Sequence, residues 1–405
     1  MGIAPDDTAS PVVLRKMVYA GSHASSFEQA SQDLKEEAEL DISTQRIMRA
    51  TKRIGQERVA EREAEVAAWE KLPLPEQQGS PREQVPQVAC VEMDGGRIQI
   101  RDRNAEEPPA EEGRKGRFWR ETKVGCLLSM RSEPSSTDPC PMIPGVFVDA
   151  GRMGQISREI KGFSAVGEVA ASEESVPEKR RDRPEVLVRS VVATRQNVET
   201  FGKQLATAAW RRGFMAAERK AFVGDGSETN WSVWRRYFSH FTPIVDFIHA
   251  LCYVFAGAMA GRAMLEAWPV YCQWAQCLWS GQVELVIAAL RERQKILGLP
   301  EANDPEESPR WKVAEALRYL ENQQSRMRYD EYRRQGLPIT SSHIESTIKQ
   351  INRRVKGSEK FWSGGGAEAL LQLVADYLSD TQPLTAFWRE RTNRATGQRH
   401  YQTAG

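Results

Sequence analysis

The segment VACVEMDGGRIQIR, residues 88–101, sets the first expectation for the fold. Residues 88–93 form a short apolar run of the kind that makes a buried strand. Asp94-Gly95-Gly96 then predicts a turn, because Asp and Gly tolerate turn conformations, and residues 97–101 would return as the partner strand of a hairpin. The Asp94 carboxylate would therefore stand at the end of a strand.

More extended runs follow along the chain. They are expected at residues 118–130, 184–193, 221–224 and 242–246. The run at 221–224 ends at Asp225-Gly226, so a second aspartate would also stand at a strand end. An Asp-Gly pair after a strand is usually only a turn. Two such pairs at neighbouring strand ends would instead bring two carboxylates within reach of one metal ion.

The composition limits the class of protein. The chain has 405 residues, of which 40% are hydrophobic and 27% charged, as in globular proteins with a sizeable core. Its 56 basic and 55 acidic residues give a net charge of +1, so binding to nucleic acid would need local basic patches. The sequence shows neither a membrane-spanning apolar run nor a secretory signal, which predicts a cytoplasmic protein with no membrane partner. The six cysteines lack the spacing of a metal site.

The first part of the chain predicts a helical N-terminal region. Residues 1–24 are expected to be a polar leader, and residues 73–86 a linker rich in Pro, Gly and Gln. Between them, residues 25–72 predict two helices joined by a tight turn. The second helix carries four basic residues on its polar side: Arg46, Arg49, Lys52 and Arg53. This pattern suits a helix-turn-helix DNA reader, and an ordinary helix pair with a solvated basic face would have the same pattern.

The second half of the chain is predicted to be mostly helical. Residues 247–335 indicate a helical block, and residues 336–380 contain further helices. Residues 381–405 are expected to be a basic, flexible tail.

A third acid lies at the start of the helix predicted from Ser342. Ser342 and Glu345 form a capping box, in which the Glu345 carboxylate would only fold back onto the backbone of Ser342. The helix has an apolar stripe, and one position along it the same spacing repeats in polar residues: Glu345, Lys349, Asn352 and Lys356, flanked by Arg353. Such a face is either a solvated, salt-bridged surface or a phosphate-lined path to an acid.

The order of these features resembles the DDE transposases of bacterial insertion sequences, specifically the Mutator-like group. The segment VGDG at 223–226, followed by Trp231, and PIVDFIH at 243–249 resemble the second-aspartate segment and the D-x-x-H element of that group. Further segments resemble the C-terminal catalytic block of that group: Gly336-Leu337-Pro338-Ile339, Glu345-Ser346, Lys349-Gln350 and Asn352-Arg353-Arg354, followed by Phe361-Trp362 and residues 366–369. The resemblance covers about residues 88–378.

The resemblance implies an α/β (α+β) fold with a ribonuclease H-like mixed sheet. The catalytic core would comprise residues 87–246 and 336–380, separated by an all-α insertion at 247–335. It implies an enzyme that cleaves and joins the ends of an insertion sequence by phosphodiester hydrolysis and strand transfer. Two Mg²⁺ ions, with Mn²⁺ as a substitute, would be held by Asp94, Asp225 and Glu345, with Asp94 bridging both ions. Asp246 and His249 would support these ligands or position DNA.

The implied partners are double-stranded DNA, as inverted-repeat ends and as target, and further copies of the chain assembled on DNA. The DNA-binding residues would be Arg46, Arg49, Lys52, Arg53, Lys349, Asn352, Arg353, Arg354 and Lys356. The protein would be associated with the bacterial nucleoid when bound to DNA. Two alternatives remain: an inactive transposase relic that still binds inverted repeats, and a host ribonuclease H-like nuclease. The long helical insertion favours a transposase, since a compact host nuclease needs only a short connection there.

Overall fold

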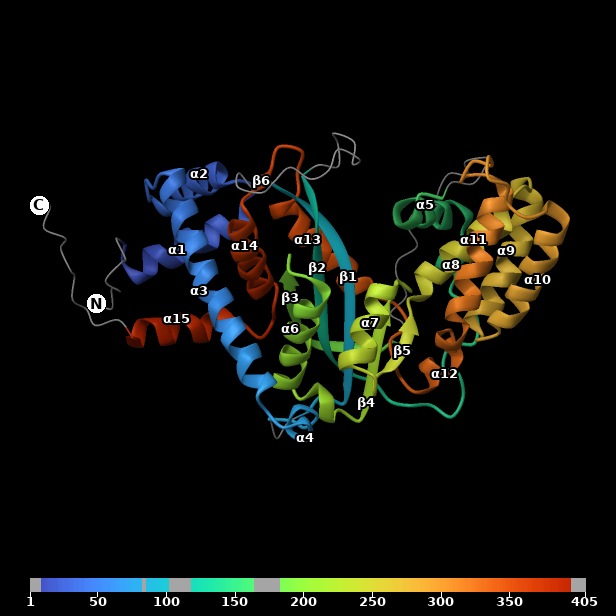
Figure 1. Cartoon of the computed structure of the whole chain (residues 1–405), viewed down its shortest axis with the longest axis horizontal. Coiled ribbons are helices and arrows are strands. Elements are labelled where there is room, and N and C mark those ends of the chain that lie inside the picture. Colours follow the sequence, from blue (N-terminus) through green and yellow to red (C-terminus); the bar gives the residue numbers. More distant parts are fainter. Residues whose placement is uncertain (1–8, 82–84, 102–117, 164–182, 395–405) are drawn as a thin grey trace, which may run out of the picture.

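The computed structural model describes residues 9–81, 85–101, 118–163 and 183–394. A mixed sheet lies at the centre, between a group of helices from both ends of the chain and a block of helices from its second half (Figure 1). The mixed α/β class predicted from the sequence is confirmed. Within the described ranges, no helix is both long enough and apolar enough to cross a membrane.

The sheet has six strands. Five of them follow the order β3-β2-β1-β4-β5. Their bounds are β1 (Val88–Ile100), β2 (Trp119–Arg131), β3 (Glu185–Thr194), β4 (Arg219–Gly224) and β5 (Thr242–Val245). The β1–β2 and β2–β3 pairs are antiparallel, and the β1–β4 and β4–β5 pairs are parallel. The short β6 (Phe361–Trp362) pairs in parallel with the far end of β1.

The hairpin expected at Asp94-Gly95-Gly96 is wrong. β1 runs straight through this segment, and Asp94 lies opposite Val124 of β2. Neither Gly95 nor Gly96 adopts a positive φ, so the turn that their composition favours does not form. The reason is the long partner strand, which pairs with the backbone on both sides of the two glycines. Only the parallel pairing with β4 stops near Asp94, at Glu92 and Val223.

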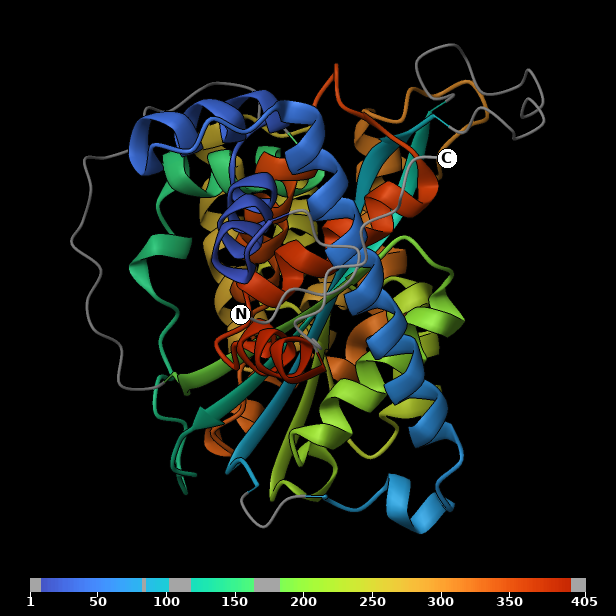
Figure 2. The ribbon, with the colours of Figure 1, turned by 90° about the vertical axis from the view of Figure 1, so that its left-hand side faces the viewer.

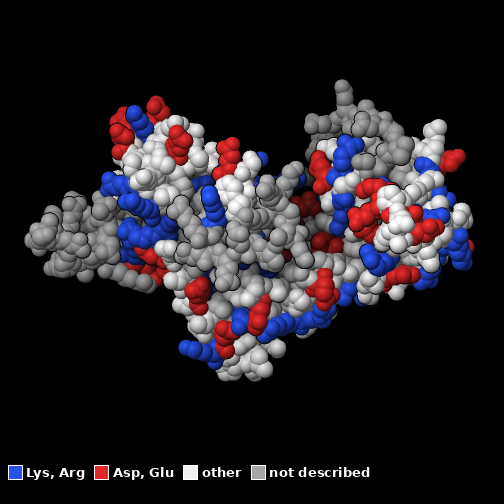
Figure 3. All heavy atoms as spheres, turned by 45° about the horizontal axis from the view of Figure 1, so that its top comes forward, with Lys and Arg blue, Asp and Glu red and all other residues white. Residues whose placement is uncertain are grey.

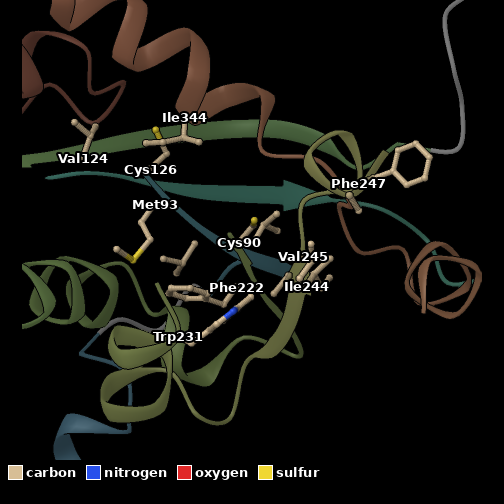
Figure 4. Close-up of a cluster of buried hydrophobic side chains, with 14 of the residues drawn as sticks. Cys90, Met93, Val124, Cys126, Phe222, Trp231, Ile244, Val245, Phe247 and Ile344 are labelled. Carbon is tan, nitrogen blue, oxygen red and sulfur yellow. The ribbon is translucent and has the colours of Figure 1, made fainter. Parts of the chain in front are cut away.

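Helices cover both faces of the sheet. Gly125 of β2 faces α6 (Val198–Arg211), since a Cβ at Gly125 would lie 2.6 Å from Leu205. The next residue, Cys126, faces α13 (Ser342–Val355), where its Sγ lies 3.3 Å from the Thr347 hydroxyl. Consecutive strand residues point to opposite faces, so α6 and α13 lie on opposite sides. Figure 4 shows Ile344 beside Cys126 on the α13 side, and Phe222 packed with Trp231 of α7 (Glu228–Tyr237) on the other.

The helical block lies beyond β5. It contains α8 (Phe247–Met259), α9 (Met264–Trp279), α10 (Val283–Leu297), α11 (Pro309–Gln323) and α12 (Tyr329–Arg334). All of residues 247–335 are described, and no strand occurs among them. A further helix, α5 (Ala150–Lys161), comes from the connection between β2 and β3 and packs against α8. Two separate parts of the chain therefore build this side of the molecule.

The polar leader and the flexible tail expected at the two ends are wrong where the structure describes them. Residues 11–23 form α1 (Pro11–His23), which buries Leu14, Met17 and Val18. Residues 383–394 form α15 (Pro383–Arg394), which buries Phe387 and Trp388. These apolar side chains pack together in a small second core with α2 and α3. Apolar residues spaced along polar helices were enough to fold both ends onto the same surface.

The N-terminal helix pair is joined to the rest of the protein. α2 (Phe27–Ala38) and α3 (Thr44–Glu70) are separated by five residues, and the short α4 (Leu74–Gln77) follows. α3 has 27 residues and packs along α14 (Gly364–Tyr377), and its later part reaches α6. Figure 2, which faces this side, shows the long helix crossing the molecule. The second helix of the predicted helix-turn-helix is therefore part of the long α3, which packs on α14 and α6.

Candidate active site

Asp94 of β1 and Asp225, the residue that directly follows β4, stand at the same level of two adjacent parallel strands. The last paired residues of β1 and β4, Glu92 and Val223, each stand two positions before one of the aspartates. Burial raises the pKa of Asp94, the hydrogen bond from Gly95 N lowers it, and the negative charge of Asp225 raises it further. The two carboxylates are therefore close enough to repel each other.

The Asp225 carboxylate is held at the start of α7. Its Oδ1 accepts hydrogen bonds from Ser227 N and Asn230 Nδ2, both at 2.9 Å. The Tyr319 hydroxyl of α11 donates to the main-chain carbonyl of Asp225 at 2.8 Å. Gly226 follows with a φ of +94°, a conformation that favours glycine. This Asp-Gly pair is thus a turn, as its composition indicates, and the turn also presents an acid beside β1.

Glu345 lies in the first turn of α13, close enough to Asp94 and Asp246 for their charges to act on it. The capping box described for Ser342 and Glu345 is not formed. The N-cap residue of the helix is Ser341, and its side chain accepts no hydrogen bond from the first backbone N–H groups of the helix. The Glu345 Oε1 atom is buried and has no hydrogen-bond partner among the described residues. Burial raises the pKa of Glu345, and so do the negative charges of Asp246 and Asp94. The Glu345 carboxylate therefore does not cap the start of its helix.

Asp246 and His249 form a hydrogen-bonded pair at the start of α8. Asp246 is fully buried, and its Oδ1 accepts from His249 N at 2.7 Å and lies 3.1 Å from His249 Nδ1. Its Oδ2 accepts from Ser341 N and from the Ser341 hydroxyl, the latter at 2.8 Å. Burial alone would raise the pKa of Asp246, but the bonds from His249 and Ser341 outweigh it and lower the pKa. Burial would lower the pKa of His249, but Asp246 outweighs it and raises the pKa.

Sequence reasoning missed Glu92, a fifth acid at this site. Glu92 lies on the same face of β1 as Asp94, two residues earlier, and is completely buried. Its Oε2 accepts a hydrogen bond from Ile344 N of α13 at 2.8 Å, and its Oε1 has no partner among the described residues. Burial raises the pKa of Glu92 to about 8. A charged residue inside an apolar strand was the available signal. We call these five residues the acid cluster: Glu92, Asp94, Asp225, Asp246 and Glu345.

The expected DNA-binding residues lie on two helices. On α3, Arg46 and Arg49 are exposed, whereas Lys52 and Arg53 are half-buried. On α13, three basic residues are exposed on the helix that carries Glu345: Lys349, Arg353 and Lys356. Asn352 is half-buried, near the strand segment at Gly96. The basic face predicted for α13 therefore exists beside the acid cluster.

Arg354 is not part of this face, and its expected role in DNA binding is wrong. Only 3% of its surface is exposed, and its Nε and Nη2 donate to the Gly21 carbonyl of α1 at 3.0 and 2.8 Å. The guanidinium also lies over the rings of Phe27 and Trp362. Burial lowers the pKa of Arg354 to about 10. The residue follows Ile351 by three positions and so falls on the apolar side of the helix, where it joins α13 to the N-terminal helices.

No family model matches the chain, and no curated protein matches it. Within the described ranges, no three His, Cys, Asp or Glu side chains converge as the ligands of a single ion would. The chemistry of the site is therefore argued from its own residues.

Proposed function

We propose that this protein is a DDE transposase related to the Mutator-like group, which cleaves and joins the ends of an insertion sequence. The observation that carries the proposal is the state of Glu345. Its carboxylate lies within electrostatic reach of Asp94, its capping box is not formed, and one buried oxygen has no partner among the described residues. A purely structural carboxylate at a helix start would be satisfied by the backbone instead.

The strand order supports a ribonuclease H-like core. Three antiparallel strands continue into the two parallel strands β4 and β5. After the helical block, α13 returns to pack on β1 and β2. The first acid thus lies in β1, the second directly follows the neighbouring β4, and the third comes from a helix that packs on β1 and β2. This is the order in which the resemblance distributes the catalytic acids.

The donor chemistry of the acid cluster fits Mg²⁺. This ion prefers carboxylate oxygens, which Asp94, Asp225 and Glu345 supply without any Cys or His. A buried oxygen without a partner costs about 1–3 kcal/mol, so Glu345 Oε1 favours a cation nearby. When bound, two Mg²⁺ ions would activate the attacking oxygen and stabilise the leaving oxygen of a phosphodiester.

The other residues of the site would bind and orient DNA. The raised pKa of His249 favours the protonated ring, which can donate a hydrogen bond to a phosphate oxygen. Asp246 holds that ring, and through Ser341 it also holds the start of the Glu345 helix. The exposed Lys349 and Arg353 would neutralise phosphates along the path to the acids.

The test is Asp225→Asn, compared with Glu228→Gln. The asparagine side chain would keep an oxygen that accepts from Ser227 N but would remove the negative charge. Glu228 is an exposed acid one turn further along, paired with Arg235, and serves as the matched control. With Mg²⁺, nicking of DNA that carries the element's ends should fall on the order of 1,000-fold in Asp225→Asn only, while DNA binding in EDTA stays within about 2-fold.

Two outcomes would contradict the proposal. If Asp225→Asn nicks DNA at the wild-type rate, the acids are not catalytic. If the wild-type protein binds the ends but never nicks them with Mg²⁺ or Mn²⁺, the inactive relic is the correct alternative.

A further inference from the structure

Lys161 is a cation on the packed side of α5. The helix buries Met153 and Ser157, and Ile156 and Ile160 pack against the main core. Lys161 follows Ser157 by four positions, so it extends the same face of the helix. The Asp149 side chain caps the start of the helix at Arg152 N, 2.8 Å away, and Gly162 ends it with a φ of +71°. The position of Lys161 is therefore set by a well-capped helix.

This face of α5 directs Lys161 towards the acid cluster. Its Nζ lies 5.0 Å from the centre of the Tyr253 ring on α8, one helical turn after His249. The Tyr253 ring stacks on Tyr319, with 3.8 Å between ring centres, and the Tyr319 hydroxyl donates to the Asp225 carbonyl. Lys161 is thus connected to the turn that carries Asp225 through two stacked aromatic rings.

The positive charge of Lys161 acts on the acid cluster, but Lys161 forms no ion pair with an acid among the described residues. The positive charge of Lys161 is felt at Asp94 and at His249. Nevertheless, Lys161 makes no salt bridge with any residue that the structure describes. In contrast, Lys203 and Lys295 lie 2.8 and 2.7 Å from glutamate oxygens. The Lys161 ammonium is half-buried and interacts with the Tyr253 side chain, but no acid among the described residues forms a salt bridge with it, so its charge can still bind an anion.

The surface around α5 has matching charge. Figure 3 shows a hollow between the sheet side and the helical side of this face, with acidic side chains in its floor. Lys and Arg side chains gather along the edge on the helical side. The basic residues that α5 can contribute to such an edge are Arg152, Arg158 and Lys161, while α13 on the sheet side offers Lys349 and Arg353. Basic groups thus stand on both sides of acids, as a channel for a polyanion requires.

We propose that Lys161 binds a backbone phosphate of the DNA strand that enters the acid cluster, and that α5 forms one wall of the DNA channel opposite α13. This inference rests on the proposed function, because it assigns a DNA contact to the same site. It adds a contact from the β2–β3 connection, which no motif of the sequence indicated. The contact is to phosphate, so it is independent of base sequence.

The experiment compares Lys161→Met, Lys161→Arg and Lys295→Met. Met keeps the length of the side chain and removes its charge, Arg keeps the charge, and Lys295 lies on α10 at the far side of the helical block (Figure 1). The probe is a fluorescent duplex of arbitrary sequence in EDTA, titrated between about 50 and 200 mM salt. Lys161→Met should bind about 5- to 10-fold more weakly at low salt, with a salt slope smaller by roughly one. Lys161→Arg and Lys295→Met should bind like the wild type.

A second measurement needs no variant. Acylation of Lys161 in the wild-type protein should slow on addition of the duplex, whereas acylation of Lys295 should not change. The inference is overturned if Lys161→Met keeps wild-type affinity and salt slope, or if DNA leaves the acylation of Lys161 unchanged. If Asp225→Asn still loses nicking while it keeps DNA binding, only this inference fails and the proposed function stands. If the wild-type protein binds no DNA at all, the proposed function is overturned as well.

Discussion

Two buried clusters of acidic residues in this protein differ in how their charges are satisfied. Between α3 and α14, each carboxylate has an arginine. Arg58 Nε donates to Asp376 at 2.9 Å, and Arg62 Nη2 donates to Glu368 at 2.8 Å. Glu368 also accepts from Arg195 N at 2.9 Å. This α3–α14 cluster fastens the N-terminal helices to the central layers.

The acid cluster has no such arginines among its described contacts. Glu92 and Glu345 each keep one buried oxygen without a partner in the described part of the chain. Cationic groups that act on these acids are His249, Lys161 and Lys349. Burying an acid without a partner opposes folding, so the comparison separates charges that hold the fold from charges kept available for a ligand.

The largest expected effect is on activity, in Glu345→Gln. Removing this charge should lower Mg²⁺-dependent nicking on the order of 1,000-fold, because a metal ligand is lost. The free energy of unfolding in EDTA should stay within about 1 kcal/mol of the wild-type value or rise above it, since the lost oxygen had no partner. Nicking assays and urea unfolding measure the two quantities. A clear loss of stability would mean that Glu345 is structural and that the two clusters do not differ.

In the α3–α14 cluster the opposite result is expected. Arg62→Met leaves Glu368 buried without its charge partner, which should lower the free energy of unfolding by about 3–5 kcal/mol. Arg236→Met, which breaks an exposed pair with Glu199, should cost less than about 1 kcal/mol. Urea unfolding of both variants provides the measurement. Equal stability of Arg62→Met and wild type would show that α3 is not anchored by these charges.

The smallest expected effect is a pH dependence that belongs to the acid cluster. Folded Glu92 keeps its proton up to a pKa of about 8, whereas the unfolded chain releases it near 4.5. The folded state binds more protons in this window, so stability is lost as pH rises through it. We compare the free energy of unfolding of Glu92→Gln with that of the wild type, without divalent metal. The difference (variant minus wild type) should increase by roughly 2–4 kcal/mol as the pH is raised from about 5 to about 8. Glu228→Gln should show no such trend; a flat difference for Glu92→Gln would refute the raised pKa.

The sequence indicated four of the five acids, all except Glu92, through the resemblance and their order along the chain, but the structure predicted around Asp94 was wrong. Asp94 was expected at a hairpin turn, but it lies inside a long strand, at the point where the parallel neighbour stops. The local composition of a Gly-Gly pair cannot reveal that a distant strand will pair across it. Glu345 was found by its helical face, while the choice between a capping box and an acid cluster depended on the chain around it.

Local sequence patterns were enough to predict the mixed α/β class, the helices of residues 247–335 and the basic face of α13, because strand runs and helical periodicity are local properties. Which charged side chains are buried, and which acids lie together, depends on the three-dimensional packing of the chain. Arg354 bonds to a carbonyl 333 residues away in the chain, and Glu92 bonds to a helix 252 residues away. Burial and charge pairing depend on such distant contacts, which no local spacing specifies.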